Sequence, residues 1–398
     1  MRHSGFSNFV RPYGHYGTMR AIVSATDQPH FANASSEIKL SDRLSLIHIE
    51  PPSPAPNQVR IKVLTTAVNP ADVLQSKGAY PSPRGASRVL GLECAGIIDQ
   101  VGAEATSLPG CSWIHEGVAA CALLEGGGYA DYAVVDAKQV LPIPTLPEAA
   151  TAALRAEANR ANNIIPATEE TSNIAPASAP DLDTLVATMG LVESAAASWM
   201  ILENIGKLAS NPGRSVLIHG ASGGVGSIAV QLANSMGNTV YATAGSPKRC
   251  ERVQDLGASK CFDYHDAWLE QLKELQPSGV DVIMDVLGAG GLSTNLKALA
   301  RYGHLAVLGL LQGAKAELNL GYLLAKNASI TAQTLRSQTP KRKIEILQQL
   351  REYVWPAVEA GQIKPVIGAT YPLEEIAAAH KAIAGRGDST FGKIVITL

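Results

Sequence analysis

Several features are scarce in this chain of 398 residues, and each scarcity excludes a class of protein. Lysine and arginine number 33 against 35 aspartates and glutamates, so no basic excess is present to bind a nucleic-acid backbone. No apolar run approaches the length that spans a bilayer. The five cysteines form no C-x-x-C pair and are too few for a disulfide framework. We therefore expect a protein of a reducing compartment, with neither nucleic acid nor membrane as its main partner.

Acidic residues are also absent from positions 1–18, which contain arginines and serines. This composition has some character of a mitochondrial transit peptide, but no clear amphipathic pattern accompanies it. The other interpretation is an N-terminal extension before a fold that begins at Met19. We expect a cytoplasmic protein, with a mitochondrial location as the alternative.

Alternating apolar residues in the first third of the chain predict a mostly β region. The segments 19–25 and 58–69 alternate clearly, and 93–102 and 127–144 continue the pattern. Glycine and proline are frequent between these strands, and no helical period separates them. In 147–182, by contrast, alanine, asparagine, threonine and proline dominate. This composition predicts an inserted surface loop, with a lid over a ligand site as the alternative.

After Asn211 the pattern changes to alternating strands and helices. Six predicted strands with helical segments between them are typical of a doubly wound parallel sheet in an α/β protein. Near Arg336 the pattern turns back, and a helix around 340–360 and a closing strand are expected to fold onto the first lobe. The six strands are expected at 215–219, 238–244, 261–264, 281–286, 303–309 and 329–334.

The first of these six strands ends in a glycine-rich turn, within the segment SVLIHGASGGVGSIAVQLA at 215–233. The glycines follow a strand and open a helix, which is the context that a dinucleotide-binding turn requires. They allow a tight turn and bring backbone N–H groups close to a pyrophosphate at the helix N-terminus. A glycine-rich turn without a ligand is the alternative, but the six alternating units favour a dinucleotide. The predicted contacts are Gly220, Ser222, Gly223, Gly224 and Val225.

No acidic residue stands at the end of the next strand, where an NAD site places one to bind the ribose 2′-hydroxyl. That position holds Gly245, followed by Ser246, Lys248 and Arg249. A small residue leaves room, a hydroxyl donates, and a guanidinium binds a 2′-phosphate. The sequence therefore predicts NADPH rather than NADH as the cofactor, although a solvated helix start would also explain Lys248 and Arg249.

Five motifs in a fixed order carry a family resemblance. They are NPADVLQSKGAYPSPRGASRVLGLECAGIIDQVG at 69–102, HGASGGVGSIAVQLA at 219–233, TAGSPKRCERVQDLGA at 243–258, LGLLQG at 308–313 and FGKIVI at 391–396. Together they resemble the medium-chain dehydrogenase/reductase superfamily. The resemblance is closest to its zinc-free quinone oxidoreductase (zeta-crystallin) group, including the p53-inducible quinone oxidoreductase-like members. It covers about 19–398 apart from the insertion.

The resemblance implies an N-terminal extension at 1–18 and two domains. A GroES-like, mostly β catalytic domain would comprise 19–188 and 336–398, and a Rossmann NADPH-binding domain would comprise 189–335. Homodimers or homotetramers that pair through the cofactor domains are also implied. Asn69 and Tyr80 fall at substrate-side positions. The residues implied around the cofactor are Gly245, Arg249 and Tyr264 at the 2′-phosphate, Gly309, Leu310 and Leu311 near the nicotinamide, and Gly392 and Lys393 where the tail closes over it.

Zinc-dependent relatives carry a cysteine where this chain has Asn69 and a histidine where it has Leu92, so the resemblance implies no metal. Without zinc or an evident base, a simple alcohol is a poor substrate, and a quinone or an α,β-unsaturated carbonyl is a better hydride acceptor. Asn69 is predicted to donate a hydrogen bond to the carbonyl oxygen, and Tyr80 to donate a proton or stack on the acceptor. Helix capping by Asn69 and plain packing by Tyr80 are the alternatives.

The function that these observations predict is an NADPH-dependent quinone oxidoreductase. A 2-alkenal or enone double-bond reductase would share every motif and is the nearest alternative. An enoyl-thioester reductase would need a basic entrance for the carrier arm of its substrate. From a different class, a cofactor-binding protein with a structural or RNA-binding role is the alternative, and the slight acidic balance disfavours RNA.

Overall fold

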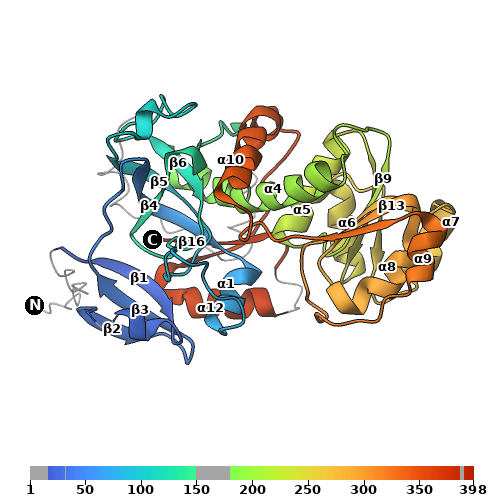
Figure 1. Ribbon diagram of the computed structural model, residues 1–398, viewed down its shortest axis with the longest axis horizontal. Coiled ribbons are helices and arrows are strands. Elements are labelled where there is room, and N and C mark those ends of the chain that lie inside the picture. The colour runs from blue at the N-terminus through green and yellow to red at the C-terminus, as the bar shows by residue number, and fades with distance from the viewer. Residues whose placement is uncertain (1–16, 32, 149–179, 386–389) are drawn as a thin grey trace, which may run out of the picture.

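The computed structural model describes residues 17–31, 33–148, 180–385 and 390–398. Positions 1–16 of the predicted extension and most of the predicted insertion lie outside these residues, so both stay predictions. Two lobes lie side by side, each built around its own large β-sheet (Figure 1). Helices α4 (Val192–Trp199) and α5 (Gly224–Ser235) pack against each other between them.

The sheet on the right of Figure 1 has six parallel strands in the order β11-β10-β9-β12-β13-β14. Counted along the chain, this is the order of a Rossmann-type doubly wound sheet, as predicted. Every residue of β9 is buried because helices cover both faces of the sheet. The strands are β9 (Ser215–Ile218), β10 (Thr239–Ala244), β11 (Lys260–Asp263), β12 (Val280–Asp285), β13 (Leu299–Val307) and β14 (Ser329–Ala332). The other helices of this lobe are α6 (Pro247–Asp255), α7 (Trp268–Leu275), α8 (Leu292–Ala298) and α9 (Leu320–Lys326).

The other lobe contains a seven-stranded, mainly antiparallel sheet in the order β15-β16-β4-β5-β6-β8, with β7 paired to β4. The last strand pairs with β4, with Ile394 opposite Val68, so the C-terminal tail folds onto the first lobe as predicted. The strand expected at 127–144 is two strands, β7 and β8, separated by a 3-10 turn. The strands are β4 (Gln58–Val68), β5 (Glu93–Val101), β6 (Ala119–Leu123), β7 (Tyr132–Asp136), β8 (Val140–Pro142), β15 (Ile367–Pro372) and β16 (Lys393–Thr397). A separate sheet contains β1 (Met19–Ser24), β2 (Ser36–Lys39) and β3 (Leu44–Ile49).

A long helical run, Leu182–Ile205, joins the two lobes. By length and composition it could cross a membrane, which corrects the expectation that no segment reaches that length. However, 94% of its most apolar window is buried inside the protein, as in a core helix. One hydrophobic cluster contains residues of this run together with Ala67 of β4 and Val216 of β9, so the two large sheets share a core. The predicted domain boundary at 188/189 stays a prediction.

The remaining helices belong to the lobe of the seven-stranded sheet and to the run that joins the two lobes. The helix expected around 340–360 is a continuous run of three segments, α10, η7 and α11. The elements are α1 (Pro70–Ser76), α3 (Leu182–Met189), η5 (Met200–Ile205), α10 (Pro340–Gln349), η7 (Leu350–Val354), α11 (Trp355–Glu359) and α12 (Ile376–Ala384). Short 3-10 turns are η1 (Gln28–Phe31), η2 (Ala105–Ser107), η3 (Ala137–Gln139), η6 (Gly288–Gly291) and η8 (Leu373–Glu375).

Candidate active site

The glycine-rich turn connects β9 to α5 at the point where the strand order of the parallel sheet reverses. Gly220 has a φ of 67°, which favours glycine, and a Cβ on Gly226 would overlap the Gly220 carbonyl oxygen. The helix N-cap is Gly223, which provides no side-chain cap. Because the first N–H groups of a helix have no partner within the helix, this end can bind an anion. The turn therefore fits a pyrophosphate.

Gly245 and Tyr264 lie in contact where β10 and β11 end, and Arg249 lies near the start of α6, which follows β10. A Cβ on Gly245 would lie 2.7 Å from the Tyr264 hydroxyl, so only glycine fits there without a shift of the ring. The Ser246 hydroxyl caps α6 by accepting from the Arg249 N–H at 3.4 Å. Lys248 is exposed. The structure thus groups the residues predicted around the 2′-phosphate, and their role there stays a prediction.

The segment before β16 lies against the glycine-rich turn. The N–H of Gly392 donates to the Ser222 carbonyl at 2.9 Å, and the Arg249 Nη2 donates to the Thr390 carbonyl at 2.9 Å. A further Arg249 contact is the Nη1–Ser222 Oγ hydrogen bond of 3.3 Å. The Arg252 guanidinium lies 4.0 Å from the centre of the Phe391 ring. These contacts connect the chain end to both predicted phosphate-binding regions.

Behind the turn lies a buried ionic cluster of Asn69, Glu93, Glu193 and Lys393. The Lys393 Nζ is 2.6 Å from the Asn69 Oδ1, 2.9 Å from the Glu93 Oε1 and 3.2 Å from the Glu193 Oε2. Burial alone lowers the pKa of Lys393, but the two carboxylates outweigh it, and the pKa is raised. Burial raises the pKa of Glu193, and the charge of Lys393 opposes that rise. The cluster therefore retains its ammonium charge.

The cluster changes how Asn69 and Lys393 can act. Asn69 is 1% exposed, and its Nδ2 donates to the Glu93 Oε1 at 3.0 Å. Asn69 is the N-cap of α1, and its backbone N–H donates to the Asp72 Oδ2 at 2.9 Å, but its side chain makes no capping hydrogen bond. The Lys393 stem packs beside Gly224, while its charge faces the cluster rather than the turn. Direct roles for Asn69 at the substrate and for Lys393 at the cofactor stay predictions.

The Tyr80 side chain contacts the loop that follows β14. Its hydroxyl donates to the Thr334 Oγ1 at 3.2 Å, and the Arg336 guanidinium lies 5.4 Å from the centre of its ring. Arg336 is 7% exposed and donates through Nε and Nη2 to the Glu125 carbonyl at 3.1 and 2.6 Å. Within the described residues, the Arg336 Nη1 and the Gln75 Oε1 are buried without a hydrogen-bond partner.

Gly309, Leu310 and Leu311 follow β13 on the same edge of the sheet as the glycine-rich turn. The Gly309 N–H donates to the Asp285 carbonyl at 3.3 Å. Leu310 and Leu311 are 56% and 64% exposed, so apolar surface is available where the nicotinamide is predicted. The neighbouring His219 is buried between Thr243 and Asn295 at 2.9 and 2.8 Å, and burial lowers its pKa. It therefore supports the sheet edge as a neutral residue.

Sequence reasoning missed three residues of this site as functional candidates: Glu93, Glu193 and Arg336. An acid inside the apolar strand segment ECAGII was a signal for Glu93, because buried carboxylates need partners. No comparable local signal marks Arg336, whose partners come from distant segments.

Comparisons with known proteins agree with this geometry. The model of the alcohol dehydrogenase GroES-like domain matches residues 55–145, and that of the zinc-binding dehydrogenase matches residues 224–351. Mouse quinone oxidoreductase is 31% identical over 351 residues, covering 87% of this chain and 91% of its own length. The chain belongs to the medium-chain dehydrogenase/reductase superfamily. It falls in the quinone oxidoreductase (zeta-crystallin-like) group of that superfamily, as the resemblance implied.

Other members of the superfamily support the same placement. Human quinone oxidoreductase is 29% identical over 349 residues, covering 87% of this chain and 91% of its own length. The structure of Escherichia coli quinone oxidoreductase complexed with NADPH has a TM-score of 0.72 at 21% identity, covering 96% of this chain and all of that one. The GroES-like lobe and the Rossmann-type sheet of the superfamily are thus confirmed as the fold.

The name of one matching superfamily model refers to zinc. Across the described ranges, no group of three or more histidine, cysteine, aspartate or glutamate side chains is placed to hold a metal ion. Asn69 lies in the ionic cluster, Leu92 is 4% exposed in the core, and burial raises the pKa of Cys94 well out of the range in which thiolates form.

Proposed function

We propose that this protein is an NADPH-dependent reductase of quinones. The preference for NADPH rests on one observation: the end of β10, where an NAD site places a carboxylate, holds Gly245 against Tyr264, with Arg249 in the helix that follows. The choice of acceptor is supported by the mouse and human quinone oxidoreductases among the relatives. When bound, NADPH supplies the hydride.

Different residues of the chain bind the different parts of the cofactor. The N-terminus of α5 binds the pyrophosphate, and Arg249 binds the 2′-phosphate. The exposed side chains of Leu310 and Leu311 provide apolar surface for the ring end of the ligand.

On the acceptor side, negative charge develops on a carbonyl oxygen as the ring is reduced. Tyr80 can donate to that oxygen if its hydroxyl turns from Thr334, and the guanidinium of Arg336 beneath the ring stabilises the charge. The amide of Asn69 is held by Glu93 and Lys393, so Tyr80 is the better-placed donor. The same groups would serve an enone, whose oxygen also gains charge.

A panel of acceptors tests this proposal. Oxidation of NADPH is followed with 1,2-naphthoquinone, 1,4-benzoquinone and a 2-alkenal in parallel. We expect turnover of the quinones. Turnover of the alkenal alone would support the double-bond reductase instead, and tight NADPH binding without turnover of any acceptor would support a non-enzymatic role.

We further propose a homodimer that pairs through the cofactor lobes. β14 is an edge strand of the parallel sheet, and the neighbouring helix α9 has no buried residue. Leu320 and Leu324 of that helix are 61% and 77% exposed, close in sequence to the exposed Leu318. Light scattering of the purified protein should give twice the mass of one chain, and Leu324→Glu should reduce it to the mass of one chain.

A further inference from the structure

Two thiols meet in the cofactor lobe, outside the groups discussed so far. Cys250 lies early in α6 and Cys261 lies in β11, and their Sγ atoms are 3.1 Å apart. The two residues are 7% and 4% exposed. A disulfide bond is about 2.05 Å long, so the two sulfurs need to approach by only about 1 Å to form one.

The position of this pair connects it to the predicted 2′-phosphate site. Cys250 directly follows Arg249 in α6. Cys261 lies in β11, three residues before Tyr264. α6 and β11 pack against each other. A bond between the sulfurs would therefore join the two elements whose ends carry Arg249 and Tyr264.

The two sulfurs differ in their surroundings, which assigns their roles. Burial raises the pKa of both thiols. The hydrogen bond that Cys261 donates to Cys250 acts against that rise at Cys250 and adds to it at Cys261. Cys250 also lies near the N-terminus of a helix, which stabilises a thiolate. Cys250 is thus the sulfur that reacts first, and its burial makes the reaction slow.

We propose that Cys250 and Cys261 are an oxidation site, at which hydrogen peroxide oxidises the two thiols to a disulfide that displaces Arg249 and weakens binding of the 2′-phosphate. The sulfur of Cys250 attacks the peroxide, the O–O bond breaks, and a sulfenic acid forms as one water leaves. Cys261 then attacks that sulfur, the S–S bond forms and a second water leaves. Two thiols are oxidised and one hydrogen peroxide is reduced to two waters.

The bond itself is tested by mass spectrometry of the full chain treated with hydrogen peroxide. We expect the loss of two hydrogen atoms, reversed by dithiothreitol. Trypsin should release the peptide 250–252 joined to the peptide 261–273, because Arg249, Arg252, Lys260 and Lys273 are cleavage sites. Cys250→Ser and Cys261→Ser should each abolish this joined peptide. Cys111→Ser is the matched control, since Cys111 is buried beside the Pro109 carbonyl in the other lobe, and it should leave the joined peptide unchanged.

The consequence for the cofactor is tested by direct binding. This second part rests on the proposed NADPH function, whereas formation of the bond does not. Isothermal titration should show that oxidation weakens NADPH binding about tenfold, as expected when one hydrogen bond to a charged group is lost, and changes NADH binding less than about twofold. In Cys250→Ser, peroxide should change neither.

The outcomes separate the two proposals. Absence of the joined peptide at any peroxide concentration that leaves the protein folded overturns the oxidation site. Formation of the peptide with equal effects on NADPH and NADH overturns the link to Arg249. A reduced protein that binds NADH more tightly than NADPH overturns the proposed cofactor while the joined peptide still supports the oxidation site.

Discussion

The cofactor side and the acceptor side of the candidate active site are built in different ways. On the cofactor side, Ser222 and Arg249 are 27 residues apart and meet across adjacent units of one sheet. On the acceptor side, Asn69 and Lys393 are 324 residues apart, and Tyr80 and Thr334 are 254 residues apart. The first region is formed by the glycine-rich turn and by Arg249 near strand ends, and the second by side chains that distant segments bring together.

This difference has an energetic consequence. A glycine-rich turn needs only small residues and a helix N-terminus, so its loss costs ligand binding rather than folding. A buried ammonium between carboxylates needs every partner in place, because an unpaired buried charge is strongly destabilising. We therefore expect substitutions on the acceptor side to reduce stability and those at Arg249 to reduce cofactor affinity.

The largest expected effect is that of Lys393→Met. It leaves Glu93 and Glu193 buried without their cation, and should lower the free energy of unfolding by about 3–5 kcal/mol. Urea unfolding followed by circular dichroism measures it. Lys381→Met, at an exposed lysine of α12, is the control and should change stability by less than about 0.5 kcal/mol. If the two substitutions changed the free energy of unfolding equally, the ionic cluster would not be a stabilising feature.

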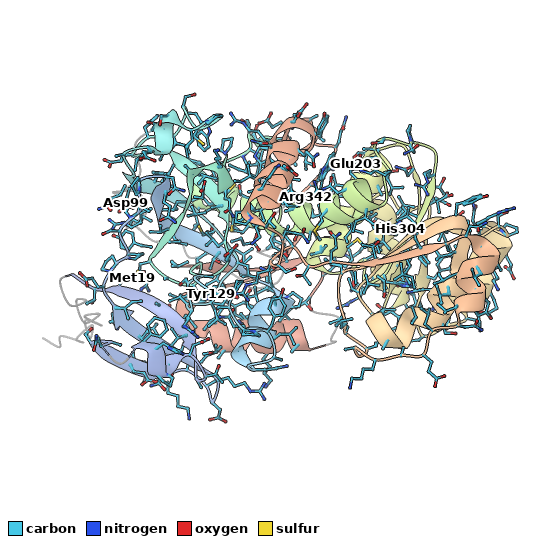
Figure 2. The ribbon with its side chains drawn as sticks, in the orientation of Figure 1. Met19, Asp99, Tyr129, Glu203, His304 and Arg342 are labelled. Carbon is cyan, nitrogen blue, oxygen red and sulfur yellow. The ribbon has the colours of Figure 1, made fainter. Side chains whose placement is uncertain are left out.

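Next in size is a pair of opposed pH effects at Asp72 and His380. Tyr129, in the left-hand lobe (Figure 2), interacts with both groups: its side chain hydrogen-bonds Asp72, and its hydroxyl is 3.4 Å from the His380 Nε2. Burial raises the pKa of Asp72 to about 6 and lowers that of His380 to about 4. The folded state holds the Asp72 proton to a higher pH than the unfolded state does. The contribution of Asp72 to the free energy of unfolding is therefore lost as pH rises from about 4 to 6. The folded state binds a proton on His380 less readily than the unfolded state does. The contribution of His380 to the free energy of unfolding is therefore lost as pH falls from about 6.5 to 4.

When one of the two groups is removed, the pH dependence of the free energy of unfolding should show the effect of the other group alone. Between pH 4.5 and 6, the free energy of unfolding of Asp72→Asn should increase relative to wild type by about 2 kcal/mol, and that of His380→Gln should decrease by a similar amount. Urea unfolding at both pH values measures these differences. His115→Gln, at an exposed histidine, is the control for adding a glutamine. Parallel pH profiles for all four proteins would show that neither group titrates as described.

On the cofactor side, Arg249→Ala should raise the KM for NADPH about 30-fold and that for NADH less than about twofold, because a hydrogen bond between charged groups is lost. Steady-state kinetics with both cofactors measures this. Lys248→Ala removes the exposed neighbouring charge and should have little effect on either KM. If Arg249→Ala changed both KM values equally, the 2′-phosphate assignment would be wrong.

The smallest effect is expected for Arg336→Lys, which keeps the charge but not the planar group beneath Tyr80. We expect kcat with a quinone to fall about tenfold while the dissociation constant of NADPH is unchanged. Arg301→Lys, at an exposed arginine of the other lobe, is the control. A rise in KM without a change in kcat would instead make Arg336 a residue that only binds the acceptor.

The parallel sheet was predictable because each strand and helix is a contiguous segment with its own hydrophobic period. The glycine-rich turn and the absence of an acid near Gly245 were equally local. The division of 127–144 into two strands was not, since a short 3-10 turn leaves little trace in the pattern. The buried run at Leu182–Ile205 shows the same limit, because burial inside two lobes and burial in a bilayer select similar residues.

The sequence by itself determined the dinucleotide fold and the position of the nucleotide-binding turn, because backbone geometry at glycines and helix ends depends on neighbouring residues. Only the tertiary structure decided that Asn69 faces Glu93 and Lys393, that Arg336 lies beneath Tyr80, and that Cys250 meets Cys261. These contacts depend on how distant segments pack. Side-chain chemistry of that kind follows from burial and from the identity of spatial neighbours, which no local pattern contains.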